Sequence, residues 1–123
     1  MLTNSKKNEI QISKRPSPYD FVTPGEYLVW AYRYQKEKAP GFSHRYLAAA
    51  MGYKSAAAFQ DIVRGRVLPK KKALKEIQKI FQLDDEETKY LVLLFVLQNI
   101  RDPFFKEVVL GEVKKVLPKK DIC

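Results

Sequence analysis

The stretch GYKSAAAFQDIVRGR, residues 52–66, has the outline of a short helix held between two glycines. Glycine readily takes the left-handed backbone conformation with which helices often end, so Gly52 and Gly65 predict a stop before and a stop after this helix. Phe59, Ile62 and Val63 share one side of such a helix and are expected to pack on a core. The opposite side, free to face solvent or a ligand, presents Ala56, Ala57, Gln60 and Arg64.

The preceding segment, FSHRYLAAAM, predicts another short helix. Ser43 suits the cap at its start, while Tyr46, Leu47 and Ala50 are expected to face inward. Ala48 lies where the two helices would approach each other, and a larger side chain there would separate them. Two short helices joined by a glycine turn inside a helical domain predict a helix-turn-helix.

Residues 23–38 predict a longer helix before this pair. In the segment TPGEYLVWAYRYQKEK, Thr23 can cap the start and Glu26 stands three residues on, which is the capping-box pattern. A spacing of i, i+3, i+4, i+7 then defines an apolar side. The residues expected on that side are Tyr27, Trp30, Ala31 and Tyr34.

Further helices are predicted after the pair, and no segment alternates like a strand. The segment ALKEIQKIFQL carries an apolar stripe. The segment DDEETKYLVLLFVLQNI opens with Asp84 as a cap and has Glu87 three residues on. After Pro103 comes a last amphipathic segment, FFKEVVLGEVKKVL. The stripe of the first of these helices consists of Leu74, Ile77, Ile80 and Phe81.

These patterns predict an all-α bundle of five to six helices that contains a helix-turn-helix. Three regions are expected along the chain. Residues 1–22 are polar and without periodicity, which predicts a flexible basic arm. Residues 23–101 form the helix-turn-helix domain, and residues 102–123 form a C-terminal amphipathic helix and tail.

The charge of the chain is concentrated in its middle third. The 123 residues carry a net charge of +9, with 46% hydrophobic and 30% charged residues, which fits one soluble globular domain. Residues 41–83 hold nine Lys/Arg against two Asp/Glu, whereas residues 84–123 hold seven against eight. A concentrated basic segment predicts a polyanionic partner, and a merely solvated basic surface is the alternative.

The segment FSHRYLAAAMGYKSAAAFQDIVRGR resembles the helix-turn-helix domains of the phage lambda repressor and Cro type. Together with ALKEIQKIFQLDDEETKYLVLL, it is more closely similar to the N-terminal region of a bacterial family of presumed transcriptional regulators. The shared pattern runs F-S-x-R, L-A, G-[YF]-x-S and G-[KR], over roughly residues 19–100. The resemblance implies duplex DNA binding and transcription regulation; if DNA binding holds, a nucleoid-associated location in the cytoplasm is expected. The distance from Gly52 to Gly65 exceeds that of the lambda-type motif by one residue, which predicts an extended turn.

The helix over residues 55–64 offers few side chains that can read bases. Bidentate recognition uses Arg or Lys on guanine and Asn or Gln on adenine. On the outward side only Gln60 and Arg64 qualify, and Ala57 can contact no more than a thymine methyl group. Lys54 and Ser55 add two polar side chains at the helix start. We therefore expect limited sequence readout.

The sequence offers more side chains for contacts with the phosphate backbone than for base recognition. Three consecutive lysines occupy the first turn of a predicted helix, where the helix dipole disfavours cations and a bound phosphate would reverse that effect. A solvated lysine face is the alternative. Binding through six such contacts would weaken steeply with salt. The residues expected to contact phosphates are Ser43, His44, Arg64, Arg66, Lys70, Lys71 and Lys72.

Other kinds of site find no support in the sequence. His44 is the only histidine and has no second ligand at metal-binding spacing, so no metal, cofactor or catalytic centre is expected. No apolar run approaches the length of about 18 residues that predicts a membrane helix. The single cysteine, Cys123, is typical of a reducing cytoplasm. Aromatic residues at helical spacing could stack on bases but are expected in the core; they are Tyr27, Trp30, Tyr32 and Tyr34.

The C-terminal third is unusually apolar for its place outside the predicted helix-turn-helix. It either covers the core or meets another chain, and a homodimer through the C-terminal helices is the preferred interpretation because helix-turn-helix proteins bind paired half-sites. A second hypothesis for function also stays open. The alanine-rich face of residues 56–64 could accept a protein partner, which would make the chain a protein–protein interaction module that does not read DNA.

Overall fold

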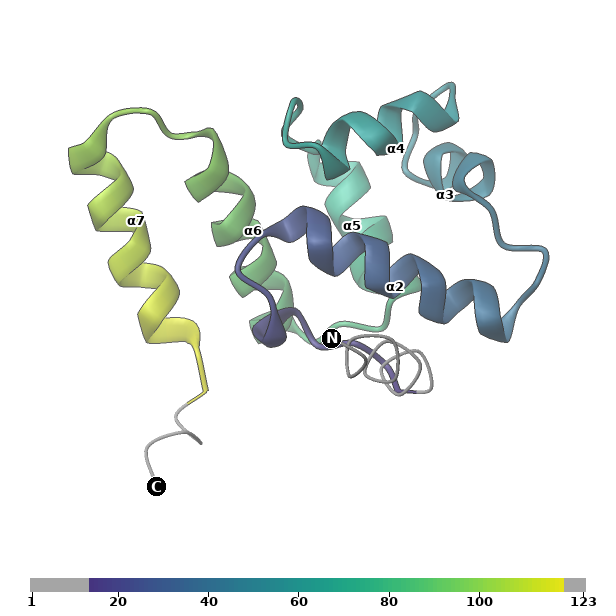
Figure 1. Ribbon diagram of the computed structural model, residues 1–123, viewed down its shortest axis with the longest axis horizontal. Helices are drawn as coiled ribbons and strands as arrows, with labels where there is room; N and C mark the ends of the chain where they lie inside the picture. Colours follow the sequence, from purple (N-terminus) through teal and green to yellow (C-terminus); the bar gives the residue numbers. More distant parts are fainter. Residues whose placement is uncertain (1–13, 119–123) are drawn as a thin grey trace, which may run out of the picture.

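A computed structural model describes residues 14–118 (Figure 1). This part of the chain contains six α-helices, one short 3-10 helix and no β-strand, so the prediction of an all-α bundle of five to six helices is confirmed. None of its helices is long and apolar enough to cross a membrane. The elements are η1 (Pro18–Asp20), α2 (Pro24–Lys38), α3 (His44–Ala50), α4 (Ala56–Val63), α5 (Lys71–Ile80), α6 (Asp85–Asn99) and α7 (Pro103–Val116).

Local capping explains where the long helices begin. The side chain of Asp84 accepts from the backbone N–H of Glu87, whose own carboxylate accepts from the backbone N–H of Asp84, so the capping box predicted for α6 is confirmed. At the start of α2 the Thr23 hydroxyl accepts from the N–H of Glu26 and donates to its carboxylate. The cap predicted there is confirmed, but Glu26 bonds the hydroxyl of Thr23 instead of its backbone N–H.

The main core lies between α2, α3, α4, α5 and α6. Tyr27, Leu28 and Ala31 form the buried side of α2, whereas Trp30 and Tyr34 are half-buried. The predicted apolar side of α2 is therefore wrong at those two positions, because its inward face is centred on Leu28. The cluster consists of Tyr27, Leu28, Ala31, Phe42, Leu47, Ala48, Met51, Phe59, Ile62, Ala73, Ile77, Phe81, Leu83, Leu91 and Phe95.

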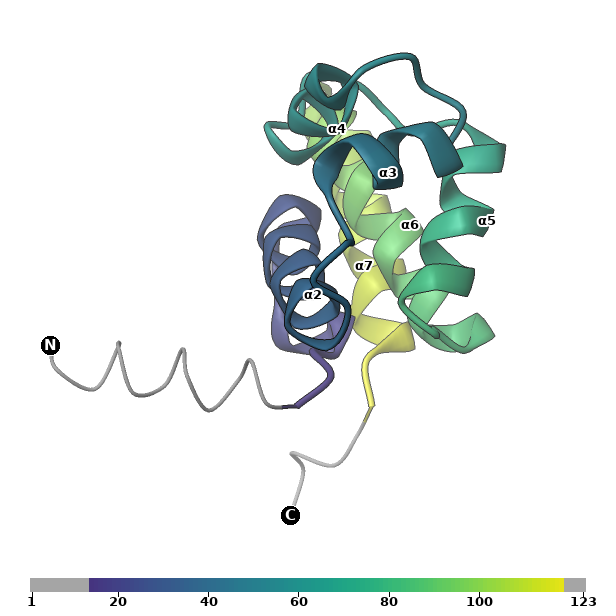
Figure 2. The ribbon, with the colours of Figure 1, turned by 90° about the vertical axis from the view of Figure 1, so that its right-hand side faces the viewer.

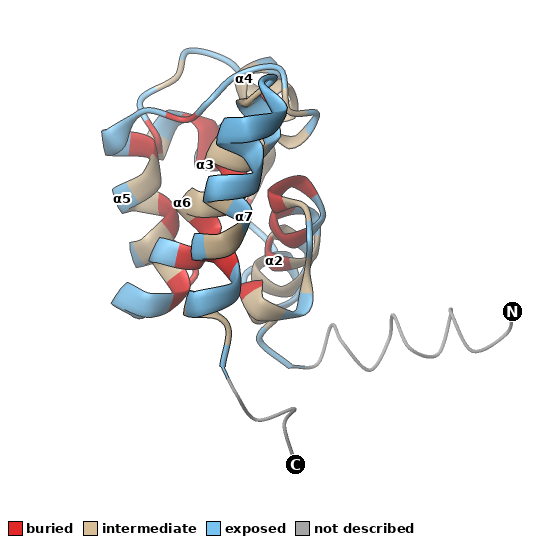
Figure 3. Ribbon diagram, turned by 90° about the vertical axis from the view of Figure 1, so that its left-hand side faces the viewer, coloured by how far each residue is buried: buried red, intermediate tan, exposed pale blue. Residues whose placement is uncertain are grey.

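A second, smaller cluster joins α6 to α7. Tyr90 and Leu94 of α6 pack against Val113 of α7, and these three residues are buried. Figure 1 shows the two helices side by side, with α7 on the edge of the molecule away from α3 and α4. The buried residues of the bundle, coloured in Figure 3, lie on the inward sides of the helices.

The segment that leads into α2 packs against α6. The Tyr90 hydroxyl donates to the carbonyl of Phe21 at 2.6 Å, and the Arg15 guanidinium pairs with the buried Glu87 carboxylate at 3.2 Å. Tyr19 stacks obliquely on Tyr90, with ring centroids 5.2 Å apart. A flexible arm is predicted for residues 1–22, but residues 14–22 pack against the fold because their side chains and backbone contact α6. Residues 1–13 lie outside the described part of the chain.

Candidate nucleic-acid interface

Helices α3 and α4 pack against each other across a turn that contains Gly52. The Ser43 side chain accepts from the N–H of Tyr46 at 3.0 Å and starts α3. Gly52 has a φ of 92°, and the N–H of Tyr53 donates to the carbonyl of Ala48 at 2.8 Å, which closes the end of α3. The left-handed conformation predicted for Gly52 is confirmed, and it returns the chain so that α4 starts beside α3.

Helix α4 has one buried and one exposed side. Phe59 and Ile62 are buried and Val63 is half-buried, as predicted. On the other side, Ala57 and Arg64 are exposed. The inner side thus fixes α4 to the core, and a shallow, alanine-rich surface faces outward.

The C-terminal end of α4 is fixed by an unusually close contact with α2. Gly25 lies in the first turn of α2 and is buried. A Cβ atom at this position would overlap the carbonyl oxygen of Val63, the last residue of α4. The positive end of the α2 dipole therefore faces the carbonyl end of α4, an arrangement that the helix dipoles favour. Only glycine permits this approach.

The start of α5 lies against the turn between α3 and α4. The backbone N–H of Lys70 donates to the Tyr53 hydroxyl at 3.4 Å. The side chain of Lys72 runs past Gly52, since a Cβ there would lie 3.3 Å from its Cδ atom and 3.7 Å from its Nζ atom. Figure 2 shows α3, α4 and the start of α5 at the same end of the molecule. Lys54, in the turn, thus joins the lysines of α5 on one surface.

The first turn of α5 has neither a side-chain cap nor an acidic residue. Lys70 stands at the N-cap position, and its side chain has no acceptor for the free N–H groups of the helix start. Helices α2, α3, α6 and α7 each have a side-chain cap. Ser55 at the start of α4 makes no capping hydrogen bond either. The N-termini of α4 and α5 are thus the two helix starts of the described chain without a side-chain cap.

Exposed cations stand in the turn before α4, at the end of α4, in the loop that follows it and at the start of α5, and we call them the basic surface. Arg66 forms a loose pair with Asp61 at 3.9 Å, with both side chains well exposed, so that pair neutralises little charge. Within residues 14–118 the other members take part in no ion pair. The basic surface consists of Lys54, Arg64, Arg66, Lys70, Lys71 and Lys72, all exposed.

His44 occupies a different place from these cations. Its ring stacks on Tyr32 with centroids 3.9 Å apart and lies 5.3 Å from the ring of Phe59. Burial lowers the pKa of His44, as does the nearby ammonium of Lys36, which donates to the carbonyls of residues 40 and 42. The imidazole is therefore a packing group between α2, α3 and α4, and its surroundings disfavour the cationic form.

The remaining predicted residues divide between the surface and the interior. Gln60 is half-buried and lines a cavity of about 270 Å³ with His44, while Ser43 uses its hydroxyl as the α3 cap. Ser55 and Ala57 are exposed at the start of α4. Sequence reasoning does not single out Tyr53, whose hydroxyl links the turn to α5; a tyrosine after a glycine carries no signal of such a contact.

The aromatic residues of α2 do not form a common stacking platform. Tyr27 is completely buried, as expected for a core residue, and its hydroxyl has no hydrogen-bond partner within the described chain. Trp30 lies under the guanidinium of Arg33 at 5.0 Å. Tyr32 belongs to the stack with His44 described above. Because Tyr27 is buried and Tyr32 is stacked on His44, these two rings are not available to stack on bases beside Trp30.

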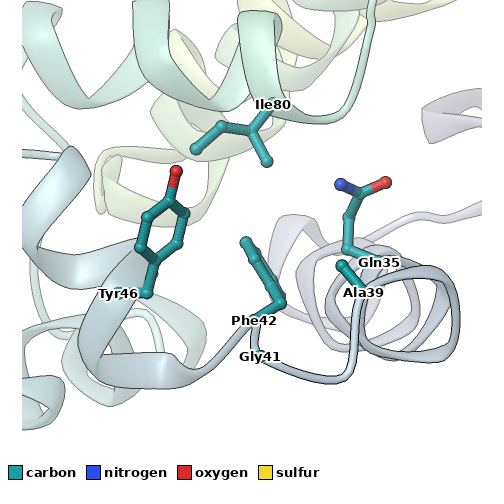
Figure 4. A pocket seen from close by; sticks show the side chains of 6 residues that line it. All are labelled: Gln35, Ala39, Gly41, Phe42, Tyr46 and Ile80. Atoms are coloured by element: carbon teal, nitrogen blue, oxygen red, sulfur yellow. The ribbon is translucent and has the colours of Figure 1, made fainter.

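A second hollow, between the end of α2 and helices α3 and α5, is shown in Figure 4. Its volume is about 370 Å³, and Phe42, Tyr46 and Ile80 form much of its wall. No charged side chain lines it, and residues 14–118 contain no group of three or more His, Cys, Asp or Glu that could hold a metal ion.

Comparisons with models of protein families, with curated proteins and with solved structures gave no match for this chain.

Proposed function

We propose that the protein binds double-stranded DNA through the basic surface and acts as a transcriptional regulator in the cytoplasm, associated with the nucleoid. The observation that supports this most is the meeting of two uncapped helix starts with exposed lysines around them. Lys70 and Lys72 contact the turn that leads into α4, and Lys54 stands in that turn. Helices α3 and α4 then act as a helix-turn-helix.

A phosphate group would supply the hydrogen-bond acceptor and the negative charge that the start of α5 lacks. The first N–H groups of a helix and the positive end of its dipole attract anions. Lysines in the same turn are disfavoured by a few tenths of a kcal/mol each when no anion is present. A bound phosphate accepts hydrogen bonds from those N–H groups and neutralises the lysines. It therefore removes both unfavourable features, the unsatisfied N–H groups and the cations at the positive end of the dipole. The neighbouring start of α4 also lacks a side-chain cap and follows directly on Lys54 and Ser55.

Base readout under this proposal is limited. Arg64 is the exposed side chain of α4 best suited to guanine, and Gln60 is half-buried beside the His44 ring. Ala57 adds an apolar contact at most. We therefore expect a preference among duplex sequences that is small compared with the salt-dependent, sequence-independent part of binding.

The test is to neutralise the lysines of α5 and compare them with lysines elsewhere. A variant with Lys70, Lys71 and Lys72 changed to Gln should bind duplex DNA with a log–log salt slope shallower by about 3. A control variant changes three exposed lysines of α6 and α7 in the same way. It should keep the slope of the unmodified protein. Equal effects of the two variants would contradict the proposal. The control residues are Lys89, Lys106 and Lys114.

An alternative function, a protein–protein interaction module, is favoured by one observation. The loop between α4 and α5 exposes Val67 and Leu68, which lie next to the alanine-rich side of α4 in sequence. Such a surface could accept a helix or loop of a protein partner. It predicts negligible duplex affinity at physiological salt. Changing Ala57 to Trp would then remove partner binding, whereas DNA binding through the basic surface would continue.

A further inference from the structure

Helix α7 presents an apolar face that the described part of the chain does not cover. Val113 packs inward against Tyr90, while Phe104, Phe105 and Val108 are 65%, 58% and 52% exposed. The two phenylalanine rings pack edge to face, with centroids 5.3 Å apart. Figure 3 views the molecule from this side, with the exposed turns of α7 toward the viewer. We call these residues, with Gly111, the outer face of α7.

Gly111 lies in the middle of this helix, and no contact within the described protomer requires a glycine there. Apart from its two chain neighbours and the backbone of α7 itself, no heavy atom of the described chain lies within 4 Å of the position that its Cβ would take, and its φ is not positive. Glycine weakens a helix relative to alanine, so an alanine would serve the isolated chain better. Phe104 and Gly111 are two helical turns apart and lie on the same side. The outer face therefore combines a projecting ring with a recess.

We propose that α7 pairs with α7 of a second copy of this chain, antiparallel, across a two-fold axis near Val108. Each Phe104 ring then packs over Gly111 of the other copy. A two-fold interface must be complementary to itself, which a face with both a projection and a recess satisfies. The antiparallel arrangement also sets the positive start of each helix beside the negative end of the other.

Charge favours this face over the rest of the molecule. Glu112 and Lys115 form an ion pair at 3.3 Å beside the apolar residues, and α7 carries three Lys against two Glu, so two copies of the helix meet with little net charge. The segment 41–83 carries nine Lys/Arg against two Asp/Glu and would repel its counterpart in a second copy. Charge repulsion between two copies is therefore weakest at the C-terminal helices.

The area of the outer face suits a modest dimer. A fully exposed phenylalanine offers about 200 Å², so the exposed parts of Phe104 and Phe105 give about 250 Å² and Val108 adds about 50 Å². One side of a standard interface buries about 800 Å², of which roughly 500 Å² is apolar. Three side chains thus supply over half of the apolar share. We expect a dissociation constant in the micromolar range.

The pairing stands independently of DNA binding, because none of its residues belongs to the basic surface. If both hold, the two-fold axis presents two α4 helices together, and the second half-site binds at a high effective concentration. A monomer that binds DNA, or a dimer that does not, would separate the two proposals.

Sedimentation velocity of the full chain, from below to above tens of micromolar, tests the dimer. Gly111→Gln should weaken self-association by roughly tenfold or more, because the recess is filled. It should leave the thermal midpoint of the monomer, measured at the lowest concentration, unchanged or higher. Phe104→Ala should weaken the dimer as well. The matched control Lys114→Gln, an exposed residue of α7 beside this face, should sediment like the unmodified protein.

Orientation is tested by a disulfide. In a Cys123→Ser background, Val108→Cys should cross-link rapidly under mild oxidation, because the axis brings the two copies of residue 108 together. Lys114→Cys should cross-link far more slowly. A monomer at tens of micromolar, or a dimer that tolerates both Gly111→Gln and Phe104→Ala, would overturn the proposal. So would binding to phosphatidylcholine or phosphatidylglycerol vesicles that Phe104→Ala abolishes, which would assign the face to lipid.

Discussion

The contact between Gly25 and Val63 fixes helix α4 in space, and changing Gly25 to Ala tests it. Gly25 is buried in the first turn of α2, and an added methyl group would overlap the Val63 carbonyl oxygen and lie 3.1 Å from its carbonyl carbon. Both groups belong to the backbone of a helix, so neither can rotate away. Helices α2 and α4 must move apart to accept the methyl group.

We expect this substitution to destabilise the fold by about 1–2 kcal/mol. Overpacking of a core costs about 1–3 kcal/mol, and the better helix propensity of alanine offsets up to about 1 kcal/mol of that cost. A loss of 1 kcal/mol lowers the melting temperature of a domain of this size by roughly 4–8 °C. Urea denaturation should show a lower midpoint at an unchanged slope. DNA affinity should fall as well, because the C-terminal end of α4 moves.

Gly41 provides the matched control. A Cβ atom there meets nothing within 4 Å, and its φ is not positive. Gly41→Ala should therefore be neutral or stabilise the protein by up to about 1 kcal/mol through the unfolded state. If Gly25→Ala proved as stable as Gly41→Ala, helices α2 and α4 could not approach each other as described, and the position derived for α4 would be refuted.

Three further changes test local features of the fold. Gly52→Ala should cost about 1–2 kcal/mol in urea denaturation, because its φ of 92° is unfavourable for a residue with a Cβ. Asp84→Ala removes the cap of α6 and should cost about 1 kcal/mol; Asp84→Asn, which keeps an acceptor for the Glu87 N–H, should cost less. The third concerns pH. Because the folded protein lowers the pKa of His44, the unfolded chain binds its proton more readily. The stability that this histidine contributes should thus be complete above pH about 6.5 and decline as the pH falls below that value. His44→Phe, which keeps an aromatic ring in the stack, should remove this dependence, and an unchanged pH profile would contradict the assignment.

Local signals predict much of this fold. The pair formed by Asp84 and Glu87 defines the start of α6 because both partners of the capping box lie within one turn. Gly52 and Gly65 have φ values of 92° and 78°, and these left-handed positions end the two short helices as predicted. The buried side of α4 follows from helical spacing alone. In the first two cases the decisive feature is local to a few residues of sequence.

Local sequence patterns do not predict positions whose burial or contacts depend on residues far away in the sequence. Tyr46 is predicted to face inward but is 58% exposed, because Leu47 and Ala48 take the inward positions of α3. The residues around Gly25 in the sequence do not predict its contact with the carbonyl of Val63, because Val63 lies 38 residues further along the chain. The packing of residues 14–22 on α6 likewise depends on partners about 70 residues away.

The candidate site shows the same division. Lysines 70–72 are read directly from the sequence as cations at a helix start, whereas their position beside the turn at Gly52 depends on the fold. His44 is predicted to contact phosphate from its place at the start of α3. Its ring instead stacks on Tyr32, and no periodicity in the sequence distinguishes a ring that turns inward from one that turns outward at a helix start.

The salt dependence of duplex binding shows whether the basic surface holds the DNA backbone. The measurement uses a duplex of about 12 base pairs, long enough for one protomer only, at salt concentrations from about 50 to 200 mM. Six cations of the basic surface predict a slope of log K against log salt of about −5, which corresponds to a loss of about 10³ in affinity over that range. Absence of binding at the lowest salt, or a slope shallower than about −2, would contradict the claim that this surface holds the DNA backbone.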